Sequence, residues 1–401
     1  MAKPLIVRQE YLDTLIGFKD KRLIKIVTGI RRCGKSTLFE LYQKWLRKHG
    51  VAREQIIAIN FEDPDFEDMR DWKKLYNHIK RLLISGKMNY VFLDEIQNVP
   101  DYQRAADGLY IKKNVDLHLT GSNAYMLSGE IATLLSGRYI EVQMLPLSFK
   151  EYVSAAGGQG LSRLYNRYLT ESSFPYALEL AGDHKKLNEY LGGIYNTILN
   201  KDVIGRNKIN DFFMLESVLR FMFFNIGNLT STTNIANTMK SQGRGISVHT
   251  VENYLALLRD SYILYRATRY DVKGKQYLQT GDKYYAADMG LRYFLLGTKN
   301  VNMGSMLENI VYLELLRRGK RVYVGKAGTA EIDFIAETPG GGTEYYQVSL
   351  SVRTADILAR ELSPFKMVKD HNPKYLLTLD DDPETSHNGI RQLYALDWLL
   401  G

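Results

Sequence analysis

The amino-acid sequence predicts an α/β fold, in which a parallel sheet with helices on its faces precedes a helical region and a smaller α/β unit. Three observations predict this arrangement. Short apolar, β-branched runs alternate with amphipathic stretches over the first 150 residues, a pattern typical of parallel sheets. From about residue 149 to residue 209 the pattern is mostly helical and is interrupted by Gly-Gly pairs. After residue 300, one helical stretch leads into four strand-like runs.

The strands expected in the first part are residues 23–29, 55–63, 89–95, 117–123 and 139–145, and helices are expected at 36–50 and 72–86. In the middle of the chain, three helical stretches precede two strand-like runs, which is the order of a winged helix-turn-helix. These are residues 212–224, 232–240, 247–260, 262–270 and 283–290. The last part is expected to hold a helix at 305–319 and strands at 321–325, 331–337, 344–351 and 374–379.

These patterns divide the chain into four expected regions. They are a core at 1–148, a helical lid or connector at 149–211, a winged helix-turn-helix at 212–299 and a small α/β domain at 300–401. With 401 residues, of which 45% are hydrophobic, the chain is long enough for two or three separate cores.

Composition excludes several classes of protein. No run of about 18 apolar residues occurs and the start lacks the features of a secretory signal, so we expect a cytoplasmic protein with no membrane partner. Cys33 is the only cysteine, which rules out an internal disulfide framework and a multi-cysteine metal site. The net charge of +8 permits an anionic partner, and a merely solvated basic surface is the alternative.

A loop bracketed by two glycines follows the first expected strand and opens the first expected helix. Its sequence, GIRRCGKS at residues 29–36, matches the GxxxxGK[ST] pattern of a phosphate-binding loop in the required context. In such loops backbone amides surround phosphate oxygens, the lysine reaches the β and γ phosphates, and the serine hydroxyl ligates Mg²⁺. The residues predicted to contact ATP are Gly29, Ile30, Arg31, Arg32, Cys33, Gly34, Lys35, Ser36 and Thr37, with Ser36 also a metal ligand. A basic turn with chance spacing is the alternative.

Two acids end the expected strand 89–95. A nucleotide hydrolase needs a carboxylate near its metal, and Asp94 is predicted to hold Mg²⁺ through water. Glu95 is then placed to deprotonate or orient the attacking water as a general base. The alternative is a strand that ends in solvated acids, which the nearby phosphate loop makes the weaker interpretation.

Two further features suit a hydrolysis site. Ser122 and Asn123 follow the next expected strand, where a polar side chain can bridge Glu95, water and the γ-phosphate, and an ordinary polar turn is the alternative. Arg138 is a candidate arginine finger, supplied within the chain or by a neighbour. An ordinary surface or salt-bridge arginine is its alternative.

Together with the order of the later segments LLSGRYIEVQMLPLSFKEY and KYYAADMGLRYFLLG, these motifs resemble the bacterial and archaeal AAA-type ATPases of the AAA_14 group. The resemblance covers almost the whole chain and implies a sheet of the additional-strand type. It also implies the roles given above for Lys35, Ser36, Asp94, Glu95, Asn123 and Arg138. A homo-oligomer, such as a ring in which the arginine acts across the interface, follows from the same resemblance.

The third helix of the expected winged helix-turn-helix has one apolar and one polar face. Val251, Tyr254, Leu255 and Leu258 share the apolar face, and Ser247 is placed to cap the helix. A DNA-binding surface would then include Lys240, Arg244, His249, Asn253, Lys273 and Lys275. A rigid protein-interaction module is the alternative, because fold does not fix function.

The last region resembles the restriction-endonuclease-like PD-(D/E)xK fold. Glu308, Asp333 and Gln347 fall where that resemblance implies a metal-dependent site, but Ser349 stands where a lysine is implied. Without that cation the phosphoryl transition state loses stabilisation, so the sequence indicates a degenerate site and argues against nuclease activity.

The leading functional hypothesis is Mg²⁺-dependent ATP hydrolysis coupled to binding, remodelling or translocation of DNA. The alternative is a slow, nucleotide-controlled switch whose C-terminal regions hold protein partners.

Overall fold

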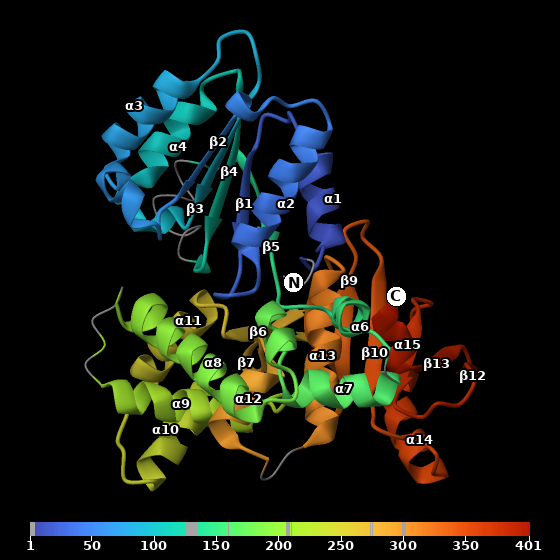
Figure 1. Cartoon of the computed structure of the whole chain (residues 1–401). Coiled ribbons are helices and arrows are strands. Elements are labelled where there is room, and N and C mark those ends of the chain that lie inside the picture. The colour runs from blue at the N-terminus through green and yellow to red at the C-terminus, as the bar shows by residue number, and fades with distance from the viewer. Residues whose placement is uncertain are drawn as a thin grey trace. The chain divides into compact units, whose positions relative to one another are not determined.

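The computed structural model describes residues 5–124, 135, 137–158, 160–205, 209, 211–272, 274, 276–298 and 302–401. The chain forms two compact units, residues 1–146 with 260–262, and residues 147–259 with 263–401. Figure 1 labels their elements along the chain. Among the described helices, none combines the length and apolar character that crossing a membrane requires.

A five-stranded parallel sheet forms the centre of the first unit. Its strands are β1 (Ile24–Thr28), β2 (Ile56–Asn60), β3 (Asn89–Asp94), β4 (Val115–Gly121) and β5 (Tyr139–Gln143). The order across the sheet is β2-β3-β4-β1-β5, so β4 lies between β1 and β3. All five expected strands are therefore present, with the additional strand that the family resemblance implied.

Helices cover both faces of this sheet, with α1 and α2 on one side and α3 and α4 on the other (Figure 1). The helices are α1 (Gln9–Gly17), α2 (Lys35–Lys48), α3 (Trp72–Leu82) and α4 (Tyr102–Tyr110), with short 3₁₀ turns η1 (Arg53–Gln55), η2 (Pro64–Met69) and η3 (Ile96–Asn98). The helices expected at 36–50 and 72–86 are confirmed as α2 and α3, whereas α1 and α4 were not predicted. Both are short, nine residues each, and give few turns in which to detect a helical period.

The second unit contains an eight-stranded sheet and the remaining helices. Its helical segments are α6 (Phe149–Ala156), α7 (Leu161–Thr170), η5 (Pro175–Leu180), α8 (His184–Thr197), η6 (Ile198–Ile204), α9 (Phe212–Phe224), α10 (Thr232–Ser241), α11 (Val248–Asp260), α12 (Met289–Leu296), α13 (Met303–Arg317), α14 (Ala355–Leu362), η7 (Ser363–Met367) and α15 (Ala395–Leu400). Its strands are β6 (Leu264–Asp271), β7 (Gln276–Ala286), β8 (Arg321–Ala327), β9 (Ala330–Glu337), β10 (Thr343–Val348), β11 (Lys374–Thr378), β12 (Thr385–His387) and β13 (Ile390–Tyr394).

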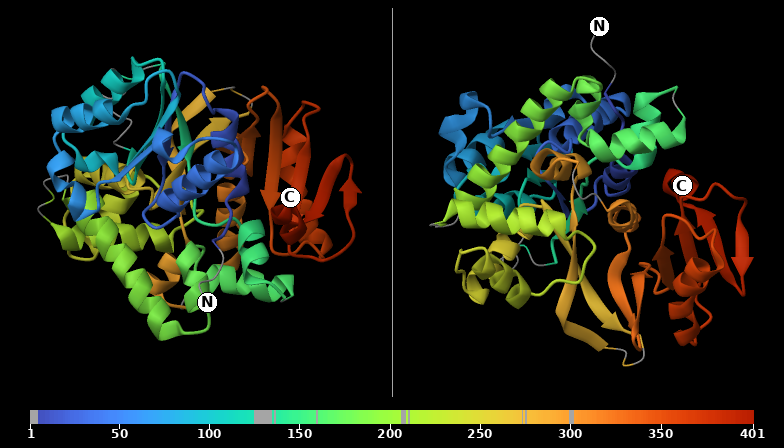
Figure 2. Two further views of the ribbon diagram at one scale, coloured as in Figure 1. Left: turned by 45° about the horizontal axis from the view of Figure 1, so that its top comes forward. Right: turned by 90° about the horizontal axis from the view of Figure 1, so that it is seen from below.

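The sheet of the second unit crosses an expected domain boundary. Its order is β12-β13-β11-β10-β9-β8-β6-β7, and β6 pairs with β8 in parallel, so the hairpin β6–β7 extends the C-terminal sheet (Figure 2). The elements expected at 212–290 are present as α9, α10, α11, β6 and β7. However, the boundary expected between residues 299 and 300 does not separate two compact units, because strands on either side of it share backbone hydrogen bonds.

Buried polar contacts tie the connector to the rest of the second unit. The carboxylate of Asp288 caps α12 by accepting from the backbone N–H of Leu291 at 2.8 Å. It also accepts from the backbone N–H and the hydroxyl of Ser173, both at 2.6 Å, and from the hydroxyl of Ser172 at 3.1 Å. Because these groups are shielded from water, the contacts fix the segment after α7 against the start of α12.

Candidate functional site

The phosphate loop, residues 29–36, lies where β1 ends and α2 begins. Gly29 has φ +144°, and a Cβ there would come within 2.1 Å of the carbonyl oxygen of Met144, so only glycine fits. Gly34 has φ +108° and forms the N-cap of α2. The loop therefore brings backbone amides to a helix N-terminus, which is the arrangement that binds phosphate.

The underside of the phosphate loop is held by a buried arginine that was not predicted. The guanidinium of Arg8 donates to the carbonyl oxygens of Cys33 and Leu145, each at 2.9 Å. Ile30 and Cys33 are fully buried below the loop, and burial raises the pKa of the Cys33 thiol. These two predicted ATP contacts can therefore offer backbone groups only, while their side chains pack in the core.

Lys35 lies in the first turn of α2 with 4% of its side chain exposed. Its ammonium group donates to the carbonyl oxygens of Gly29 at 3.0 Å and Ile30 at 3.3 Å. It also lies 3.7 Å from Oε1 of Glu95. The lysine thus sits at the mouth of the loop, between the expected phosphate position and the expected general base.

The two predicted metal ligands meet at the same place. Burial raises the pKa of Asp94, and hydrogen bonds from the hydroxyls of Ser36 and Thr120 oppose that shift. Mg²⁺ is usually held by few protein oxygens together with waters and substrate phosphates. Ser36 and Asp94 fit that donor set. The sequence did not single out Thr120, which donates its hydroxyl hydrogen to Asp94.

Glu95 is held in a strained and charged environment. Its φ of +52° is in the left-handed region, and its backbone N–H donates to the Thr120 hydroxyl at 2.8 Å. Burial alone would raise the pKa of Glu95, but the charges of Lys35 and Arg31 outweigh it and hold the pKa below the usual value. The amide of Gln97 donates to the same carboxylate. Glu95 is therefore ionised near neutral pH, as a general base must be.

Ser122 and Asn123 follow β4 and are almost completely buried. Because β4 lies between β1 and β3, its carboxyl end reaches the same edge of the sheet as Asp94. A hydrogen bond from Ser122 contributes to the lowered pKa of Glu95. The structure thus brings these residues to the expected site, while their catalytic roles remain predictions.

Arg138 is not near the phosphate loop of its own chain. It precedes β5, and its carbonyl oxygen accepts from the N–H of Ile24 at the start of β1. The loop follows the other end of β1, five residues along, which corresponds to about 17 Å. The Arg138 guanidinium instead pairs with Asp107 and lies 5.5 Å from the ring centroid of Tyr110.

The residues of the nuclease-like site also come together, in the second unit. Asp333 on β9 accepts from the backbone N–H of Val348 at 2.8 Å, and its own N–H donates to Gln347 at 3.3 Å. Burial raises the pKa of Asp333, and the charge of Glu308 adds to the effect. A cavity of about 390 Å³ adjoins Asp333 and Gln347.

A lysine that the sequence did not indicate lies within this site. The ammonium of Lys283 on β7 lies 2.8 Å from Glu308, 2.7 Å from Glu331 and 3.8 Å from Asp333, three residues that we term the carboxylate cluster. Burial would lower the pKa of Lys283, but the three carboxylates outweigh it and raise the pKa. The residue at the position implied for lysine is Ser349, and the cation in this site comes instead from a strand distant in sequence.

The residues predicted to contact DNA are partly engaged within the protein. Lys240 is exposed, and Arg244 donates to the hydroxyl of Ser217 at 2.7 Å. His249 and Asn253 are exposed on α11, 3.4 Å apart. The apolar face and the cap by Ser247 are found as expected. Lys273 and Lys275 lie outside the described residues.

Two protein-family models match parts of this chain. The family AAA_14, described as an AAA domain, matches residues 21–153, and DUF8612, a domain of unknown function, matches residues 162–302. An uncharacterized protein of Haemophilus influenzae is 39% identical over 405 residues, covering 100% of both chains. The chain belongs to the AAA_14 family.

The chain is also similar to a second uncharacterized protein and to one solved structure. Uncharacterized protein MJ1544 of Methanocaldococcus jannaschii is 30% identical over 368 residues, which cover 86% of this chain and 79% of that protein. The solved structure of the Walker-type ATPase paby2304 of Pyrococcus abyssi has a TM-score of 0.53 at 15% identity, covering 73% of this chain and 96% of that one. This likeness confirms the α/β fold with its parallel sheet. It leaves the winged helix and nuclease-like assignments as predictions.

Proposed function

We propose that this AAA_14 protein binds ATP with Mg²⁺ and hydrolyses it at the phosphate loop. The observation that carries the proposal is the convergence of three strand ends at one edge of the first sheet. There the buried side chains of Lys35, Asp94 and Glu95 meet, and the exposed Ser36 donates its hydroxyl to Asp94. That set contains the cation, metal ligands and general base that nucleotide hydrolysis requires.

Each residue has a distinct part in the proposed reaction. Lys35 exchanges its hydrogen bonds with loop carbonyls for bonds to phosphate oxygens. Ser36 and Asp94 hold the metal, which when bound neutralises charge on the phosphates. Glu95 removes a proton from the attacking water, and Asn123 orients that water. The lowered pKa of Glu95 supports its part, since an ionised carboxylate can accept the proton.

The position of Arg138 supports a role only toward a neighbouring subunit. In its own chain the residue lies beside the start of β1, whereas the phosphate loop follows the end of that strand. We therefore propose that ATP-bound subunits associate and that Arg138 completes the site of the next subunit. Measuring the mass of the assembly with and without ATP tests this, and a monomer under both conditions contradicts it.

The proposed task of the hydrolysis is to act on DNA through α10 and α11. The exposed Lys240, His249 and Asn253 support this, although Glu252 lies among them and Arg244 is already bonded to Ser217. The test is the ATPase rate with and without single-stranded, duplex and branched DNA. Stimulation supports the DNA-directed role. A rate that ignores DNA and responds to a protein partner supports the nucleotide-controlled switch.

A further inference from the structure

Helix α3 of the ATPase unit carries an unusual distribution of charge. It has four cationic residues and no acidic one. These are Lys73, Lys74, Lys80 and Arg81. Leu75 and Ile79 bury the inner side of the helix against the sheet. At 3.6 residues per turn the cationic side chains fall on the opposite side, where all four are exposed.

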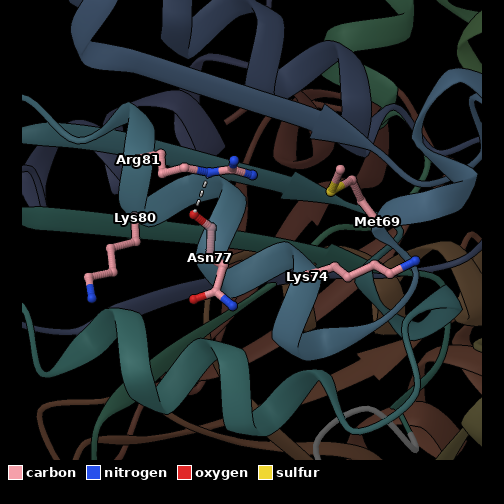
Figure 3. Close-up of a pocket in the computed structure, with 5 residues that line it drawn as sticks. All are labelled: Met69, Lys74, Asn77, Lys80 and Arg81. Atoms are coloured by element: carbon pink, nitrogen blue, oxygen red, sulfur yellow. Dashed lines mark hydrogen bonds between the residues drawn. The ribbon is translucent and has the colours of Figure 1, made fainter.

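A shallow concavity of about 670 Å³ lies on this exposed side. Met69, Lys74, Asn77, Lys80 and Arg81 line it, and Figure 3 shows three cationic side chains projecting around the amide of Asn77. The Nε–H of Arg81 donates to the backbone carbonyl of Asn77 at 3.3 Å, which holds the guanidinium beside the amide. We term Lys73, Lys74, Asn77, Lys80 and Arg81 the basic α3 surface.

The cations of the basic α3 surface form no ion pairs with described residues, although the preceding turn η2, which contacts α3, carries the acids Asp65, Glu67 and Asp68. In the described part of the chain, none of its four cations lies within ion-pair distance of a carboxylate. The nearest acid in sequence, Asp71, caps the helix by accepting from the backbone N–H groups of Lys73 and Lys74. Solvated surface helices commonly mix both signs of charge, whereas this face has one sign only.

Further cations border the same surface and occupy its aromatic rings. Lys73 and Arg104 each lie 5.5 Å from the ring centroid of Trp72. Lys112 lies 5.8 Å from the ring centroid of Tyr76. These rings are therefore already covered by cations and are not open platforms for stacking bases.

We propose that the basic α3 surface binds the phosphate backbone of a nucleic acid. Lysine and arginine side chains with an amide donor suit phosphate oxygens, and the helix rises about 10 Å from Lys74 to Arg81. A protein interface is disfavoured, because such interfaces are depleted in lysine and centred on apolar or aromatic side chains. Contacts to the backbone alone give binding without sequence preference.

The proposal rests on the nucleic-acid part of the proposed function and adds a second contact surface, in the ATPase unit itself. The decisive variant is K74E/K80E/R81E in the full chain. Its binding to fluorescent single-stranded and duplex DNA of mixed sequence is measured by anisotropy from 50 to 200 mM salt. The matched control K44E/R47E/K48E reverses three exposed charges at the end of α2.

We expect the α3 variant to bind at least 10-fold more weakly at 100 mM salt. The slope of log affinity against log salt should fall by about 2 for single strands and about 3 for duplex. The control should keep the slope of the unmodified protein. The milder K74Q/K80Q/R81Q should show a smaller change in the same direction. Unstimulated ATP hydrolysis should be unchanged in all three, which verifies folding.

Two results would overturn the proposal. The first leaves the proposed function intact, and the second also removes its DNA-directed part. If the α3 variants bind like the unmodified protein while K240E/R244E loses binding, the α3 surface is wrong and the proposed function stands. If the unmodified protein binds neither DNA at 50 mM salt, the DNA-directed part of the proposed function fails as well. ATP hydrolysis in the same samples then shows whether its enzymatic part survives.

Discussion

Lys35 in the first unit and Lys283 in the second are similarly buried, but their surroundings suit them to different roles. Lys35 and Lys283 each expose 4% of their side chain, and each lies beside carboxylates. Lys35 is bonded to two loop carbonyls and stays 3.7 Å from Glu95. Lys283 touches Glu308 and Glu331 directly, at 2.8 and 2.7 Å.

The two lysines differ in whether they can exchange their present contacts for contacts with a ligand. Hydrogen bonds to neutral carbonyls are exchanged for bonds to phosphate oxygens at a net gain, since the new acceptors are charged. The contacts of Lys283 are already charge-assisted, and removing them would leave buried carboxylates without a counter-ion. A buried lysine with weak partners is therefore available to a ligand, whereas one with matched partners stabilises the fold.

The largest expected effect comes from Lys35→Ala. The proposed site loses its phosphate-binding cation, so ATP hydrolysis should fall below detection and ATP with Mg²⁺ should no longer raise the melting temperature. Lys44→Ala, exposed on the same helix, is the control and should behave like the unmodified protein. Full nucleotide binding by Lys35→Ala would break the comparison, because the lysine would then be as structural as Lys283.

Glu95→Gln should separate binding from turnover. Loss of the general base is expected to slow hydrolysis by about 10²-fold to 10⁴-fold, while ATP affinity stays within a small factor. Single-turnover rates and equilibrium binding of ATP measure the two effects. Unchanged turnover removes Glu95 from the proposed role, and equal losses of both indicate a disrupted loop instead.

Lys283→Met is expected to act on stability rather than on ATP hydrolysis. Leaving buried carboxylates unpaired should cost about 3 kcal/mol of unfolding free energy, at the low end for a buried pair because Glu331 is one-third exposed. Urea unfolding measures the loss. Adding Glu308→Gln should recover part of it by removing one stranded charge. A variant as stable as the unmodified protein would contradict the structural role of Lys283.

The smallest expected effect concerns the ion pair of Arg31 in the phosphate loop with Glu62, 2.9 Å apart. Because 46% of the Glu62 side chain is exposed, Glu62→Gln should lower the unfolding free energy by less than about 1 kcal/mol. Thermal unfolding of the two proteins side by side checks this. A loss as large as that of Lys283→Met would mean that solvent exposure does not determine how much these ion pairs stabilise the protein.

Sequence patterns predicted the first sheet and most of its site because that information is local. The loop at 29–36 and the acids at 94 and 95 each lie at the end of a single strand. One short run of residues therefore shows both the strand and the functional groups at its end. Thr120 lies inside β4. The sequence pattern indicated Ser122 and Asn123, which follow that strand, but it did not indicate the hydroxyl of Thr120. Its partner Asp94 is 26 residues away, and only the pairing of β3 with β4 joins them.

Long-range pairing also explains what was missed in the second unit. Lys283 and Glu308 are 25 residues apart, and contact requires the hairpin β6–β7 to join the C-terminal sheet through β8. No local pattern indicates that step, since a strand pair after three helices suggests a separate domain. The strand β12, with three residues, is too short to show a period.

The continuity of the eight-stranded sheet has a mechanical consequence. Hydrogen bonds between β6 and β8, reinforced by Lys283 between β7 and the carboxylate cluster, join the hairpin directly to the C-terminal strands. A force applied to the hairpin would act on several β6–β8 hydrogen bonds at once instead of bending a flexible linker. The hairpin and the C-terminal strands would therefore resist bending together, as one continuous sheet.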